Sequence, residues 1–119
     1  MATNIKYDDA NQVALPVPAG TKSGDPVRVG GLNGIALTNR ALSTATPPEF
    51  GGGNVDGEAT CKLNGAGVFN VAFALNPGDP VYITAANALT ATSAGNSLWG
   101  HSLSTKGAPA GDAVIRVSN

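Results

Sequence analysis

Three glycine–aspartate pairs are the residues of this sequence best suited to ligand chemistry. They are Gly24-Asp25, Gly78-Asp79 and Gly111-Asp112. A carboxylate oxygen held in a turn can ligate Ca²⁺. Calcium-binding loops, however, carry several carboxylates at fixed spacing, whereas each of these pairs carries only one. We therefore interpret the three pairs as structural turns in which the aspartate accepts backbone N–H bonds, and we expect no bound metal.

The other reactive side chains are isolated from one another. His101 is the only histidine, and Cys61 is the only cysteine, so an internal disulfide is excluded. Asp8 and Asp9 are adjacent acids, but a chain terminus is a poor support for catalytic geometry. Neither a nucleophile elbow nor a phosphate-binding loop occurs in the sequence. We expect neither an enzyme nor a cofactor.

Composition favours strands and turns over helices. The 119 residues suit one domain and include 16 Gly and 8 Pro. In a helix interior each Gly costs about 1 kcal/mol and each Pro about 3 kcal/mol. We therefore predict a mainly β, single-domain fold, a small β-barrel or β-sandwich of about eight short antiparallel strands.

Charged residues make up 13% of the chain, about half the usual share of roughly 25%, and the formal net charge is −1. With no basic stripe, we expect no nucleic-acid partner. With no apolar run of about 18 residues, we expect no membrane span. Residues 1–9 lack the apolar stretch of a signal peptide, so we expect synthesis in a cytoplasm. Low charge is typical either of a surface that touches other protein or of a small, mildly polar domain.

Alternating apolar and polar residues predict the individual strands. The predicted strands are 27–29, 35–38, 58–63, 68–73, 81–84, a short one around Leu89, 97–104 and 114–117. Asn33-Gly34 signals a hairpin turn over residues 30–34. Residues 39–57 break the pattern, and residues 39–46 are compatible with one turn of helix.

Residues 1–20 are predicted to form an N-terminal arm or edge segment beside a β domain of residues 21–119. Pro16 and Pro18 exclude a central strand, because proline lacks the N–H that a sheet requires. The candidate contacts with other protein subunits are apolar: Ile5, Tyr7, Val13, Leu15, Val17, and Phe50 in the loop 47–53. The alternatives are a frayed tail followed by an ordinary edge strand, and a Phe50 that covers the chain's own core.

Two segments repeat one order of motifs. Residues 23–38 and 77–104 both begin with Gly-Asp-Pro-Val and later reach a glycine followed by a short strand that ends in leucine. In this alignment His101 occupies the position of Ile35. A lone histidine is more often structural than catalytic, so we assign it no chemistry.

The motif order also resembles a known family. The motifs are Gly24-Asp25-Pro26-Val27, Gly34-Ile35-Ala36-Leu37, Gly67-Val68-Phe69, Gly78-Asp79-Pro80-Val81-Tyr82, Leu98-Trp99-Gly100 and Gly111-Asp112-Ala113-Val114. Over residues 20–117 they resemble the capsid cement, or head decoration, proteins of tailed bacteriophages. The chain departs from the family pattern in its longer 47–53 loop and in His101-Ser102, where an apolar pair is usual.

The resemblance implies a structural virion protein that binds the outer surface of the phage head and stabilises the capsid. It further implies the major capsid protein as a partner and a homotrimer on the capsid. The alternative is a binding module, such as a head-fibre base or a small carbohydrate-binding β-sandwich. Its aromatic candidates are Tyr7, Phe50, Tyr82 and Trp99, of which we expect Tyr82 and Trp99 in the core or on a sheet face.

Overall fold

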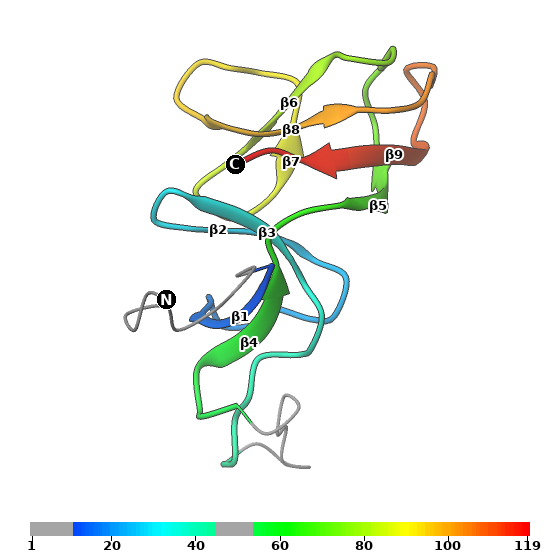
Figure 1. The fold of residues 1–119 in the computed structure, drawn as a ribbon. Coiled ribbons are helices and arrows are strands. Elements are labelled where there is room, and N and C mark those ends of the chain that lie inside the picture. The colour runs from blue at the N-terminus through cyan, green and yellow to red at the C-terminus, as the bar shows by residue number, and fades with distance from the viewer. Residues whose placement is uncertain (1–10, 45–53) are drawn as a thin grey trace, which may run out of the picture.

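The computed structural model describes residues 11–44 and 54–119, which form nine strands and no helix (Figure 1). The strands are β1 (Gln12–Pro16), β2 (Pro26–Val29), β3 (Leu32–Ala36), β4 (Glu58–Lys62), β5 (Ala66–Val71), β6 (Pro80–Ile83), β7 (Leu89–Thr90), β8 (Ser97–Ser102) and β9 (Gly111–Val117). All strand pairs are antiparallel. The predicted mainly β class is confirmed.

The strands form two curled sheets, each built from one continuous part of the chain. The first sheet has the order β1-β4-β3-β2, and the second has the order β5-β9-β8-β6-β7. The sheets meet where β3 approaches β8 and β9, in the middle of the molecule as drawn (Figure 1).

The first hairpin turn lies elsewhere than the sequence predicts. Val29 pairs with Leu32, so the turn is Gly30-Gly31, and the φ of Gly30 is 60°. Glycine at this first position suits the type II′ turn of a two-residue hairpin. Asn33 and Gly34 are inside β3, so the prediction that they form the turn is wrong. The described part of the predicted helical turn, residues 39–44, is not helical.

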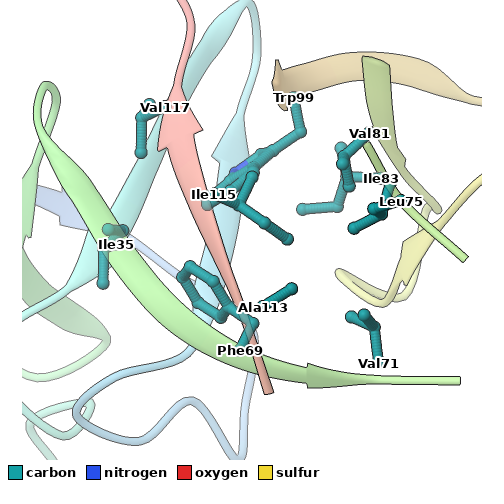
Figure 2. Packing of buried hydrophobic residues seen from close by; sticks show 10 residues of the cluster. All are labelled: Ile35, Phe69, Val71, Leu75, Val81, Ile83, Trp99, Ala113, Ile115 and Val117. Atoms are coloured by element: carbon teal, nitrogen blue, oxygen red, sulfur yellow. The ribbon is translucent and has the colours of Figure 1, made fainter. Parts of the chain in front are cut away.

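Each sheet buries a hydrophobic cluster on its concave face. The second cluster joins Val71, Leu75, Val81, Ile83, Ala113, Ile115 and Val117 to the Phe69–Trp99 pair, and Figure 2 shows it. The Phe69 and Trp99 rings meet edge to face with centroids 5.2 Å apart. Ile35 of β3 also belongs to this cluster. The first cluster is smaller and consists of Val17, Val27, Ala36, Ala59 and Cys61.

The two sheets are copies of one four-stranded unit, because β1-β4-β3-β2 and β5-β9-β8-β6 have the same order, and their registers match except for a shift between Val81 and Tyr82. Equivalent residues are Gln12 and Ala66, Pro26 and Pro80, Gly34 and Gly100, and Lys62 and Arg116. Connections outside the strands repeat as well. Gly24 N–H donates to Ala36 O (2.7 Å), as Gly78 N–H donates to Ser102 O (2.8 Å).

The two halves are equal in overall length, because two of their loops differ in length in opposite directions. The shift between equivalent residues is 54 positions from Gln12 to Ala66 and from Lys62 to Arg116, but 66 positions from Gly34 to Gly100. The second half is longer between its second and third strands, where it adds β7 to the edge of the sheet. The first half is longer between its third and fourth strands, which is where residues 45–53 lie.

Candidate interaction surfaces

Two of the three glycine–aspartate pairs form the same turn. Asp25 Oδ2 accepts a bond from Lys22 N–H, and Asp79 Oδ2 accepts one from Asn76 N–H, both at 2.9 Å. The preceding glycines, Gly24 and Gly78, have φ values of 93° and 91°. Such values favour glycine, and the aspartates cap their own turns.

The third pair is not a turn. Gly111 and Asp112 begin β9, and Asp112 accepts a side-chain bond from Asn70 of β5 at 3.4 Å. Their counterparts in the first half are Gly57 and Glu58, not a Gly-Asp-Pro-Val turn. The prediction of a third structural turn at Gly111 and Asp112 is therefore wrong.

The titratable side chains outside the turns are dispersed. Within residues 11–44 and 54–119, no group of three or more histidine, cysteine or acidic side chains could hold a metal ion. The Cys61 thiol is fully buried, and burial raises its pKa. His101 is half-buried in β8, opposite Pro80 and Arg116.

The apolar residues at 13–17 lie in the chain's own sheet. Val17 is 7% exposed and packs with the first hydrophobic cluster, and Leu15 packs against the same cluster. Val13 is half-buried and pairs with Cys61. Val17 therefore packs in the chain's own core, and the contact of Val13, Leu15 and Val17 with other protein stays a prediction. Ile5, Tyr7 and Phe50 lie outside the described residues.

The ends of the loop that carries Phe50 are tied together. Gly57 N–H donates to Ala41 O at 2.8 Å. Ser43 donates to the Asp56 carboxylate through its backbone N–H (2.9 Å) and its hydroxyl (2.8 Å), and these bonds hold the pKa of Asp56 below its usual range. The described ends of this loop therefore form a fixed base.

The edges of the two sheets are protected to different degrees. Free edges attract other strands, and proteins usually block them with proline, charge or a very short strand. The β1 edge carries Pro16, the β2 edge carries Pro26 and Arg28, and β7 has only two residues. The six-residue β5 is the remaining edge, and it contains neither proline nor a charged residue.

A hollow runs beside the open side of β5. It has a volume of about 550 Å³ and lies between residues 68–73, residues 24–26 and residues 87–89. Pockets that hold ligands usually have volumes of about 300–1,000 Å³. Within the described residues, no other strand pairs with this edge of β5.

An apolar row crosses the outer face of the second sheet. It consists of Val68, Val114 and Leu103, which lie side by side on β5, on β9 and just after β8. Val68 is 64% exposed and Leu103 is 52% exposed. The equivalent row of the first sheet is Ala14, Thr60 and Leu37, in which Thr60 Oγ1 accepts a bond from Asn54. The larger apolar surface therefore belongs to the second half.

The strand aromatics do not form an exposed platform. Trp99 is fully buried, and its Nε1–H donates to Val27 O at 3.0 Å. Tyr82 is half-buried on the opposite side of the second sheet. These positions agree with the expectation that both residues lie in the core or on a sheet face.

A family model described as phage cement protein matches residues 7–118. The chain belongs to the phage cement protein family. Membership of this family makes the chain a structural component of a phage capsid. No curated protein and no solved structure matches the chain.

None of the described residues forms a helix long and apolar enough to span a membrane.

Proposed function

We propose that this cement protein binds the outer surface of the phage head and stabilises the capsid. Its partners are the major capsid protein and other copies of itself, arranged as a homotrimer on the capsid. It is made in the cytoplasm of the bacterial host and ends in the virion. The observation that carries this proposal is the family match across residues 7–118.

Surface chemistry supports adhesion. Among residues 11–44 and 54–119, six large apolar side chains are exposed: Leu32, Leu37, Val55, Val68, Leu98 and Leu103. Single exposed apolar residues bind weakly, but contacts repeated around a shell add through multivalency. Leu37 and Leu103 are equivalent residues, because their N–H groups donate to the equivalent carbonyls of Thr60 and Val114, so both halves offer this contact.

The test uses expanded phage heads that lack the cement protein. We expect the purified full chain to co-sediment with these heads and to raise the temperature at which they break. Heads that neither bind the protein nor gain thermal resistance would overturn the proposal.

Substitutions in the same assay test which residues contact the phage head. Because residues 12–16 form β1 of the chain's own sheet, the arm is best tested by Ile5→Ser with Tyr7→Ser, which leaves β1 intact. We expect this double variant to bind heads more weakly, and Phe50→Ser to do so separately. Lys6→Ser is the matched control and should bind as the natural chain does.

A further inference from the structure

We infer that β5 is a docking edge, and that its partner is β5 of a second copy of this chain. Three of the four edge strands carry proline or charge or are too short to pair, and β5 alone is six residues of Ala-Gly-Val-Phe-Asn-Val. An exposed apolar edge without such protection is a template for another strand.

Comparison of β5 with β1, the equivalent edge strand of the first sheet, shows that β5 lacks the residues that block strand pairing. The β1 strand occupies the same place in the first sheet and has proline at positions 16 and 18. The equivalent residues in the second half are Asn70 and Ala72, which both have an N–H group. The same architecture is therefore closed at one edge and open at the other.

Hydrogen-bond phasing identifies the groups that a partner would meet. Val117 N–H donates to Gly65 O at 2.9 Å, so Gly65 points toward β9. In an antiparallel pair, alternate residues point their N–H and C=O groups to the opposite side. Ala66, Val68 and Asn70 therefore direct their backbone groups to the free edge, and a second strand can bond to all three.

One register makes two copies of this edge self-complementary. When β5 pairs antiparallel with itself about a two-fold axis at Val68, the apolar rows of the two copies join. The joined row runs from Leu103 through Val114 and Val68 to the same three residues of the second copy. Gly67 then lies opposite the second copy's Phe69, and the space over Gly67 is filled by its own chain's Phe69 ring and Ile35.

The charges of the outer face agree with the same register. Arg116 lies beside Ala66, and Asp112 lies beside Asn70. Two-fold pairing at Val68 places Ala66 opposite Asn70, so each Arg116 shares a row with an Asp112 of the other copy. Their backbones are three strand spacings apart, about 14 Å, and the long arginine side chain shortens that separation. The attraction is therefore modest and favours this register over shifted ones.

The experiment measures association of the full chain by sedimentation velocity. The natural chain should associate in pairs with a dissociation constant between about 1 μM and 1 mM. Val68→Lys should weaken pairing by about tenfold or more, because like charges would lie directly opposite each other. Ala14→Lys is the matched control at the equivalent residue of the first half, and it should pair as the natural chain does.

Charge complementation tests the register itself. Val68→Glu should also fail to pair alone, whereas an equimolar mixture of Val68→Lys and Val68→Glu should pair, because lysine would face glutamate. Asn70→Pro should abolish pairing by removing the edge N–H, and Asn70→Ala should preserve it. A natural chain that does not pair up to about 1 mM, or a mixture that does not pair, overturns the inference.

The inference goes beyond head binding and does not rest on it. Chains that bind heads normally but never pair through β5 would contradict only the docking edge. Chains that pair but do not bind heads would contradict only the proposed function.

Discussion

The two halves of the chain share one topology but distribute hydrophobic volume unequally. At equivalent core positions the first half has Leu15 and Cys61, and the second half has Phe69 and Ile115. The first cluster also lacks any aromatic residue. Because buried apolar area sets most of the stabilisation, the second half must contribute more of it. The duplicated backbone is thus compatible with one well-filled and one sparsely filled core.

The clearest difference lies between Asn33 and Trp99, the residues that precede the equivalent glycines Gly34 and Gly100. Asn33 is 4% exposed, and its Nδ2 donates to Leu98 O (2.9 Å) and Ser118 O (2.8 Å). Trp99 instead donates to Val27 O. Each residue reaches from its own sheet into the other, one through an amide and one through an aromatic ring. The pairing shifts between Val81 and Tyr82, which leaves Trp99 as the extra residue of a β-bulge. Bulges often redirect a side chain in this way.

The largest expected loss of stability comes from removing the side chains of Trp99 and Asn33, which join the two sheets. Trp99→Ala should lower the free energy of unfolding by about 3–5 kcal/mol, because it empties the centre of the second cluster. Asn33→Ala should cost about 1–3 kcal/mol, because the carbonyls of Leu98 and Ser118 lose the partly buried hydrogen bonds that the Asn33 amide donates. Urea unfolding of both variants measures the difference. Trp99→Phe is the control that removes the N–H but retains a ring. Equal losses at positions 33 and 99 would break the comparison.

The equivalent glycines of the third strands should differ next. A Cβ at Gly100 would lie 2.1 Å from Arg116 O, and a Cβ at Gly34 would lie 2.9 Å from Lys62 O. Gly100→Ala should therefore lower stability by about 3 kcal/mol or more, and Gly34→Ala by about 1–3 kcal/mol. Thermal unfolding gives the order. Gly31→Ala, at a glycine with open space around it, is the control. A larger loss for Gly34→Ala than for Gly100→Ala would show that the distances to the neighbouring carbonyls do not decide the cost.

The smallest expected losses of stability concern the aspartate-capped turn that both halves share. Asp25→Ala and Asp79→Ala should each cost about 1 kcal/mol, because each removes one side-chain acceptor from the same turn. Asp112→Ala should change stability by less than about 0.5 kcal/mol, because Asp112 is exposed in a strand. Chemical unfolding of the three variants decides. An Asp112 effect as large as the other two would restore the idea of three equivalent sites.

Sequence reasoning found the part of the duplication in which both halves keep the same residues. Gly-Asp-Pro-Val is identical at 24–27 and 78–81, and the structure places both copies in the same turn and strand. The rest was hidden, because equivalent positions such as Gln12 and Ala66 share only a strand environment. The extra residues before β8 also disrupt a constant spacing.

The incorrect turn predictions have a common cause. By local pattern, glycine at positions 34 and 111 indicates a chain reversal, but both residues lie in strands. Position 34 favours glycine because the carbonyl oxygen of Lys62 lies too close for a side chain. This is a tertiary contact, which local sequence patterns do not report. The partners of Asn33 are similarly distant, 65 and 85 residues along the chain. The prolines at 16 and 18, by contrast, correctly indicated an edge strand, because their effect is local.

The connection between the halves is short, with only residues 63–65 between β4 and β5, and Gly65 has a φ of 86°. If that connection straightens, the second half of one chain can take its place against the first half of another. Every inter-sheet bond, including those of Asn33 and Trp99, would then form between chains instead of within one. Domain swapping is thus open to this protein without any new contact, and concentrated refolding is the condition that would populate the exchanged form.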